Sequence, residues 1–268
     1  MDRLDYYLPK ERWKNLIRFF TISETGESRT YSVFPSTSFV MGFQFKGSLS
    51  YEDTHKRARP LSWNGVTGLQ TRYRVFQSTP GTGSILIHFT PSGARSFLRQ
   101  PASEVHDLSV PLSLVTDVRN LEQLQDDLFT AMDDQTRLHA VESYLERIWE
   151  PSSEDQLVSC ALSTIHKRGG LIRIQNLADI LGTSLSPLER RFKDIVGTSP
   201  KRYAGLVRLN TLFDLIAGAS GSFAELALRM GFHDQSHFIH EFKSMTGLTP
   251  QSFLEQQPPK DEFLQFED

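Results

Sequence analysis

Hydrophobic and polar residues follow a helical spacing through the last third of the chain. After Ser222, apolar residues return every three or four positions as far as Met230, which predicts an amphipathic helix. Ser222 and Glu225 have the spacing of a capping box, and Gly231 offers the positive φ with which many helices end. A second predicted helix begins at a cap on Asp234, so the two segments form a helix-turn-helix outline.

The same pattern occurs twice along the chain, fifty residues apart. Residues 184–200 read SLSPLERRFKDIVGTSP, and residues 234–250 read DQSHFIHEFKSMTGLTP. Phe192 matches Phe242, and the lysine, glycine and proline that follow keep the same offset. An internal repeat of this kind implies two copies of one supersecondary unit.

Seven helices are predicted after residue 155, and the fourth is the longest. It begins at Pro200 and has about 18 residues, so it would span roughly 27 Å and could hold the two repeats about one DNA turn apart. The others are expected at 155–167, at 174–181, from Ser184, and in three pieces within 222–256.

The first 112 or so residues instead favour strands. Four segments rich in β-branched and aromatic residues are separated by glycine and proline. These segments are 29–34, 38–45, 72–77 and 84–90. They predict an antiparallel sandwich or barrel, with the cupin fold as one option. A short helix or turn is expected over 91–98.

Helical spacing returns after about Asn120. Apolar positions predict two amphipathic helices, over 121–129 and 138–148, joined around Asp133. They could cover the sheet or form a dimerisation surface, and the sequence leaves both open. A polar break at 151–155 marks the expected domain boundary. The predicted fold class is therefore α+β, with a β-rich N-terminal domain and flanking helices followed by an all-α C-terminal domain.

Composition changes this picture little. The net charge of −3 does not by itself indicate nucleic-acid binding, but contact with phosphates needs only one basic face of the protein. No early apolar run resembles a signal peptide, and no stretch approaches a membrane span. The single cysteine, Cys160, excludes an internal disulfide and fits a reducing cytoplasm. Its apolar neighbours favour a buried structural thiol.

Residue types at fixed offsets over the last hundred positions resemble the AraC/XylS-type transcriptional regulators. The run from Ala227 to Pro250 keeps the glycine, serine, histidine, phenylalanine and threonine anchors of this family. The first repeat and the helix after it carry matching anchors, which are Ala178, Gly182, Ser184, Leu188, Arg191, Phe192, Lys193, Gly197, Pro200, Tyr203 and Arg208. The N-terminal part is more weakly similar to sensor domains of some members, through GFQFKG, GVTGLQT and HFTPSGA.

This resemblance implies a role for each region. Residues 1–150 would sense an effector or dimerise, 155–256 would bind DNA, and 257–268 would form a flexible tail. The implied partners are double-stranded promoter DNA, RNA polymerase, a small-molecule effector and a second copy of the chain. We also expect a cytoplasmic location, no membrane association, no enzymatic activity and no cofactor.

The early turns of the second helix in such a unit enter the major groove. Leu188, Phe192 and Ile195 form the predicted inward stripe of the first repeat. Phe238, Phe242 and Met245 form that of the second repeat. The base-reading candidates lie outside these two stripes, and they are Ser186, Glu189, Arg190, Gln235, Ser236, Ile239 and His240. Arg190 is the strongest because a guanidinium can pair with two acceptors of guanine, whereas Glu189 could equally be a solvated charge. The phosphate candidates are Lys193, Lys201, Arg202 and Lys243.

Two arginines have expected structural consequences. Arg173 falls where the helix at 174–181 needs a cap, and its side chain cannot accept an amide proton. This helix is therefore expected to be less firmly fixed. Arg191 is expected to form an ion pair within the protein rather than to contact DNA.

An N-terminal ligand would need polar groups inside an apolar cavity. The candidates are Gln44, Trp63, Gln70 and Arg72, each of which could equally be structural. His233 and His237 have a workable metal-ligand spacing, but the sequence places no third ligand beside them, so no metal site is expected. His88 is expected to be a packed or hydrogen-bonded histidine.

Two alternatives to a transcriptional regulator stay open at this point. One is an enzyme with a β-barrel catalytic domain and an appended DNA-binding module. The other is a DNA-architectural or purely protein-binding role, which would show little sequence preference.

Overall fold

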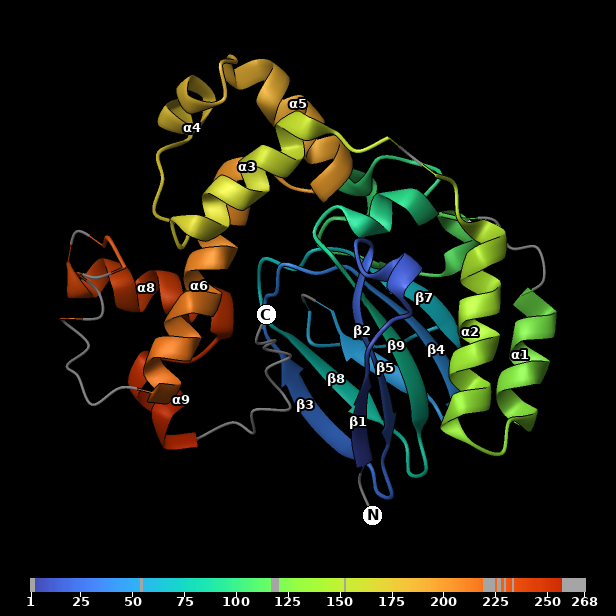
Figure 1. Cartoon of the computed structure of the whole chain (residues 1–268). Coiled ribbons are helices and arrows are strands. Elements are labelled where there is room, and N and C mark those ends of the chain that lie inside the picture. The colour runs from blue at the N-terminus through green and yellow to red at the C-terminus, as the bar shows by residue number, and fades with distance from the viewer. Residues whose placement is uncertain are drawn as a thin grey trace. The chain divides into compact units, whose positions relative to one another are not determined.

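A computed structural model describes residues 3–53, 55–116, 121–151, 153–218, 225, 228, 230–232 and 234–256. The fold is α+β and divides into two compact units (Figure 1). The β-rich unit comprises Met1–Tyr31, Ser38–Gly68 and Val75–Ser153. The helical unit comprises Glu154–Asp268 together with two short segments, Ser32–Thr37 and Leu69–Arg74.

Antiparallel strands build two sheets within the described residues. The larger sheet has the order β1 (Arg3–Tyr7), β2 (Ile17–Glu24), β9 (Gly83–Phe89), β4 (Val40–Lys46), β7 (Asn64–Thr67), β10 (Ser109–Val110). The smaller sheet has the order β3 (Arg29–Val33), β8 (Arg74–Ser78), β5 (Leu49–Glu52), β6 (Ala58–Pro60). The four predicted strand segments correspond to β3, β4, β8 and β9, and the other strands were not predicted.

The centre of the larger sheet is an apolar row across three strands. Ile85 on β9 lies opposite Ile22 on β2 and opposite Phe43 on β4, and all three side chains are fully buried. Cross-strand packing of β-branched and aromatic side chains is the main source of sheet stability. Among the described residues, short 3₁₀ helices lie between strands at Glu11–Trp13, Gly93–Phe97 and Ala102–Val105, and another, Leu112–Leu114, follows β10. The second of them confirms the short helix expected over 91–98.

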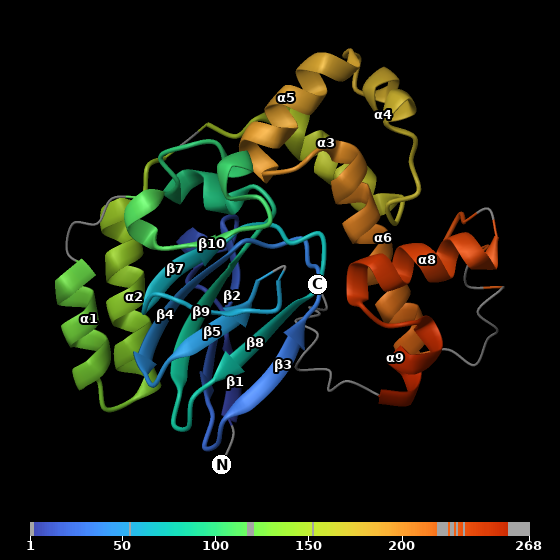
Figure 2. The same ribbon diagram turned by 180° about the vertical axis from the view of Figure 1, so that it is seen from behind.

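Two α-helices follow the strands, α1 (Leu121–Thr130) and α2 (Asp134–Ile148), and they lie beside β4 and β7 in Figure 1 and Figure 2. Asp133 caps α2 by accepting a hydrogen bond from the Thr136 amide, so the two helices join where the sequence predicts. Tyr144 of α2 packs edge-on against Phe43, with 5.8 Å between ring centroids. Helix α2 therefore covers the larger sheet.

A carboxylate at the start of α2 ties the helix to β1. The Asp134 carboxylate accepts hydrogen bonds from Arg3, Tyr7 and Arg137, with the shortest at 2.7 Å. Burial by itself would raise the pKa of Asp134, but the hydrogen bonds from Arg3 and Tyr7 outweigh burial and lower it. Helix α2 is thus held by charge-assisted bonds as well as by apolar packing.

The core of the β-rich unit also holds a neutral histidine. His88 is 1% exposed, lies 3.2 Å from the Thr21 hydroxyl through Nε2, and stacks on Phe19 with 4.4 Å between ring centroids. Burial lowers the pKa of His88 to about 3, because the charged form has lost its hydration. The expectation of a packed, hydrogen-bonded histidine is confirmed.

The helical unit contains most of the predicted helices. They are α3 (Gln156–Lys167), α4 (Ile174–Ile180), α5 (Leu185–Val196), α6 (Pro200–Gly218), α8 (Gln235–Thr246) and α9 (Pro250–Gln256). The helix predicted over 222–230 and the capping box at Ser222 fall largely outside the described residues, as does the tail from Gln257. Thr249 caps α9 by accepting a hydrogen bond from the Ser252 amide.

Aromatic side chains make the core around α6 and α8. Phe242 packs edge-on against Phe213 of α6, at 5.9 Å between ring centroids, and against Phe253 of α9, at 5.3 Å. Phe34, from the short segment Ser32–Thr37, completes this cluster. The sequence had placed Phe34 at the end of a strand, but β3 ends one residue earlier and Phe34 packs with the helical unit.

One expectation about α3 is wrong. Cys160 is exposed rather than buried. The buried stripe of α3 is Val158, Ala161, Leu162 and Ile165, which follows the helical repeat of three and four. Cys160 lies two positions after Val158, which places it on the opposite side of the helix.

Candidate nucleic-acid interface

The first helix-turn-helix unit consists of α4, a turn at Gly182 and α5. Gly182 has a φ of 62°, which a side-chain-bearing residue adopts at a cost. As predicted, Arg173 gives α4 no side-chain cap. The buried stripe of α5 is Leu188, Phe192 and Val196. Ile195, which the sequence placed in this stripe, is only half-buried because the helix turns past it before Val196.

The opposite side of α5 carries the predicted DNA-facing side chains. Ser186, Arg190 and Lys193 are exposed, and Glu189 is half-buried. Lys193 lies 3.9 Å from the Glu189 carboxylate, at the spacing of one helical turn. Part of the Lys193 charge is therefore balanced on its own helix.

Arg191 has a different role from its neighbours. Its Nε donates a hydrogen bond of 2.7 Å to Asp155, which also caps α3 by accepting from the Val158 amide. The predicted intramolecular ion pair is confirmed. It joins α5 to the start of α3.

In the second unit α8 begins at a cap on Asp234, whose carboxylate accepts a hydrogen bond of 2.8 Å from the His237 amide. Phe238, Phe242 and Thr246 form its buried stripe. The exposed candidates are Gln235, Ser236, His240 and Lys243. Ile239 is half-buried and packs against the aromatic cluster, so only part of its side chain is open to a ligand.

Helix α6 packs against both helix-turn-helix repeats. Its Tyr203 is fully buried against Phe192, at 5.5 Å between ring centroids, and shares a 2.8 Å hydrogen bond with His166 of α3. Further along, Phe213 packs on Phe242. Lys201 and Arg202 are exposed in the first turn of α6. The helix has 19 residues, so it spans about 28 Å.

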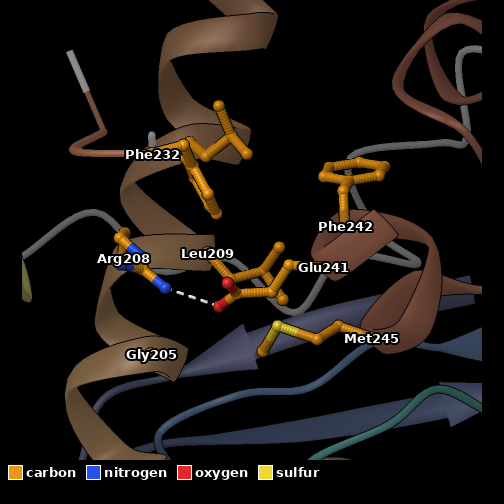
Figure 3. A pocket seen from close by; sticks show the side chains of 8 residues that line it. Gly205, Arg208, Leu209, Phe232, Glu241, Phe242 and Met245 are labelled. Atoms are coloured by element: carbon orange, nitrogen blue, oxygen red, sulfur yellow. Dashed lines mark hydrogen bonds and ion pairs between the residues drawn. The ribbon is translucent and has the colours of Figure 1, made fainter. Parts of the chain in front are cut away.

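Arg208, in the middle of α6, is not available to phosphate in the way that its charge alone suggests. Its Nη2 donates a hydrogen bond of 2.5 Å to the Glu241 carboxylate of α8. Figure 3 shows this bond at a small gap lined by α6, the turn before α8, and α8 itself. In the sequence, Arg208 was identified only as an anchor of the family resemblance, and this partner was not predicted.

The four ligand candidates do not all belong to one unit. Gln44 is buried in β4, where its amide donates to the Ser62 carbonyl and accepts from the Leu49 amide. Trp63 is half-buried, 6.1 Å from the Phe43 ring. Gln70 is half-buried and Arg72 is exposed, and both lie in the segment Leu69–Arg74 of the helical unit.

Metal binding and membrane insertion are two other possible roles for such a chain. Across the parts of the chain that the structure describes, no three histidine, cysteine, aspartate or glutamate side chains gather as metal ligands. His233 is outside those parts. None of the described helices combines the length and apolar character needed to cross a membrane.

Comparison with known families finds two matches along the chain. Residues 177–256 match the model of a helix-turn-helix domain family. Residues 5–111 match a domain of unknown function, DUF6597.

Among characterised proteins, the chain is similar to the HTH-type transcriptional activator RhaS of Escherichia coli. The two are 32% identical over 89 residues, which is 33% of this chain and 31% of RhaS. RhaS of an Enterobacter strain is also 32% identical, over 76 residues. The match thus spans about a third of the length of these relatives.

Solved structures give a weaker likeness. ToxT from Vibrio cholerae aligns with 95% of this chain and 98% of its own, at 10% identity and a TM-score of 0.46. An AraC-type DNA-binding regulator from Chromobacterium violaceum aligns with 38% of this chain and 91% of its own, at 27% identity and a TM-score of 0.35.

Proposed function

We propose that this chain, whose helix-turn-helix region is of the AraC/XylS type, is a sequence-specific DNA-binding transcriptional regulator. One observation carries the proposal. The two repeats present exposed polar side chains at matching positions, Ser186 and Arg190 on α5 and Ser236 and His240 on α8, each backed by a buried phenylalanine. Rigid backing is what a reading helix needs to enter the major groove in one orientation.

The side chains on these helices suit base edges. The Arg190 guanidinium can donate two hydrogen bonds to guanine, and the Gln235 amide can pair with adenine. Lys201, Arg202 and Lys243 are exposed and would neutralise phosphates, which fixes the register without reading sequence. With a net charge of −3 for the chain, we expect salt-sensitive but moderate affinity.

The β-rich unit would supply regulation. We propose that it senses a small molecule or joins two copies of the chain, and that a ligand acts by favouring one arrangement of the protein over another. Phe129 and Met132 are exposed where α1 leads into α2, which supports a second copy as the partner of this corner. Contact with RNA polymerase, a cytoplasmic location and the lack of an enzymatic activity belong to the same proposal.

A gel-shift assay with the promoter DNA upstream of the chain's own gene tests the proposal. Arg190→Ala should cost about 1–3 kcal/mol and relax the preference at one base pair. Lys243→Ala should weaken binding to all sequences alike and lower the salt slope by about 1. Equal losses on every sequence for Arg190→Ala would refute its base-reading role. Binding without any sequence preference would refute the proposed function and favour an architectural role.

A further inference from the structure

The flank of α8 carries a charge that does not point toward the reading side. Each residue of an α-helix turns by about 100°, so Ser236, His240 and Lys243 form one stripe and Phe238 and Phe242 another. Glu241 falls between these stripes. Its side chain is 27% exposed, so it is neither in the core nor open to solvent as the reading residues are.

Glu241 is held from α6 by Arg208. The hydrogen bond between Arg208 Nη2 and Glu241 Oε1 is 2.5 Å long, and the Arg208 side chain is 23% exposed. The same guanidinium lies over the Phe232 ring, 4.6 Å from its centroid. Arg208 therefore contacts both the turn that precedes α8 and α8 itself, as Figure 3 shows.

Phe232 extends this contact along α8. Its ring centroid lies 5.5 Å from that of His237 and 5.2 Å from that of Phe238, edge-on in both cases. A guanidinium fixed on this ring is pre-organised, so less side-chain entropy is lost in binding Glu241 than for a flexible lysine. The gap beside the pair measures about 10 Å³, which is room for about one water molecule, so it is too small to be a ligand site.

The first repeat has a corresponding ion pair with the charges reversed. Arg191 occupies the position of α5 that corresponds to Glu241, fifty residues earlier. Arg191 pairs with Asp155 at the start of α3, and α3 precedes the first helix-turn-helix. In the same way, Glu241 pairs with Arg208 of α6, and α6 precedes the second helix-turn-helix. Two reading helices that differ in surface chemistry thus keep an ion pair to the preceding helix at one repeat position.

Apolar packing decides which face of α8 is buried, but burial of apolar surface is itself non-directional, so it fixes the rotation of the helix less finely than a directional bond does. A charge-assisted hydrogen bond to a flank residue is directional. We propose that Arg208 is a positioning residue for DNA recognition: by holding Glu241 it sets the rotation of α8 about its axis, and hence the bases that Ser236 and His240 face. This inference rests on the proposed function of the two repeats.

Selection of binding sites from random duplex DNA tests the inference with the full-length chain. The wild type should yield two blocks of preferred bases, and His240→Ala identifies the block read by α8. Arg208→Met should lower the base preference in that block about tenfold, which is the discrimination that one good base contact provides. The preference in the other block should not change. The reversed pair, Arg208→Glu with Glu241→Arg, should recover most of the preference. Arg147→Met, on the exposed side of α2, is the matched control and should change neither block.

The outcomes separate the two proposals. A wild-type chain with no preferred sequence overturns the proposed function, and this inference with it. Two blocks in the wild type with an unchanged profile for Arg208→Met overturn the inference alone, as does an equal loss in both blocks. If thermal unfolding shows that Arg208→Met has lost the helical unit, Glu241→Met, which removes the acceptor and leaves Arg208 in place, is judged by the same criteria.

Discussion

The two repeats of the helical unit share a framework and differ in how each reading helix is held. Both α5 and α8 end at a glycine of positive φ, Gly197 at 84° and Gly247 at 76°. At their starts they differ, since Asp234 caps α8 with a side-chain hydrogen bond and Ser184 gives α5 none. The apolar backing and the C-terminal glycine are thus common to both, while the cap is not.

The ion pairs sharpen this contrast. Asp155 and Arg191 are 14% and 48% exposed, so the first pair is open to water on its arginine side, whereas both partners of the second pair are about a quarter exposed. Exposed ion pairs contribute about 0–1 kcal/mol to stability, and the cost of removing one partner is larger when the pair is shielded from water. We infer that α8 depends on its pair and its cap, and that α5 depends more on its apolar backing.

The largest expected effect tests the shared framework. Phe192 and Phe242 are the matching buried phenylalanines of the two repeats. Phe242→Ala and Phe192→Ala should each cost about 3–5 kcal/mol in the free energy of unfolding, because each removes a ring and leaves a cavity. Urea unfolding followed by far-ultraviolet circular dichroism measures both. A loss below about 1 kcal/mol for either variant would show that its repeat is not built around that ring.

Mild acid is expected to lower the stability of the β-rich unit through His88, which distinguishes this unit from the helical unit with its two repeats. The folded pKa of His88 is about 3, below the ordinary value near 6.5, so the unfolded chain binds a proton that the folded unit does not. The free energy of unfolding of the β-rich unit therefore has its full value above pH 6.5 and falls as the pH falls, by about 2 kcal/mol at pH 5. Trp13, Trp63 and Trp149 all belong to the β-rich unit, so tryptophan fluorescence follows it alone. His88→Gln should remove this pH dependence, and an unchanged slope would contradict the assignment.

The caps should separate the two repeats by a smaller amount. Asp234→Ala should cost about 1 kcal/mol, because the His237 amide loses its acceptor. Ser184→Ala should cost less than about 0.5 kcal/mol, since Ser184 accepts no cap hydrogen bond. Thermal unfolding of both variants, with Asp234→Asn as a cap-preserving control, measures the difference. Equal losses would remove the contrast drawn between the starts of α5 and α8.

The smallest expected effect acts on the helix that both repeats share. A Cβ added at Gly205 of α6 would meet no atom within 4 Å. Gly205→Ala should therefore stabilise the helical unit by about 0.5–1 kcal/mol through helix propensity. Site selection should be unchanged, because Arg208 keeps its partner. A lower melting temperature would mean that the gap beside Arg208 cannot accept a methyl group.

Sequence patterns predict the helical unit better than the β-rich unit, for physical reasons. Helices α3 to α6, α8 and α9 have local signals, namely apolar spacing, caps and terminal glycines. Strand β2 lacks such a signal because Phe19, Phe20 and Ile22 are all buried, so polar and apolar residues do not alternate along it. Short strands such as β6 and β10 are defined by their partners in the sheet rather than by their own residues.

The candidate site shows the same division. Exposure of Ser186, Arg190, Ser236 and His240 follows from helical spacing, and the Arg191 ion pair was also expected. The partner of Arg208 was not, since Glu241 lies 33 positions away and only the packing of α6 on α8 brings them together. The signal in the sequence was the reversal of charge between Arg191 and Glu241, at one repeat position whose first member was already expected to pair.

Binding-site selection with variable spacing between the two preferred blocks tests the central claim most directly. If α5 and α8 read one face of a duplex from either end of α6, the full-length chain should select two blocks with centres about 10 base pairs apart. Insertion of about 5 base pairs should abolish the joint preference, because it turns one block to the other side of the helix. A single block, or two blocks that tolerate any spacing, would contradict the account.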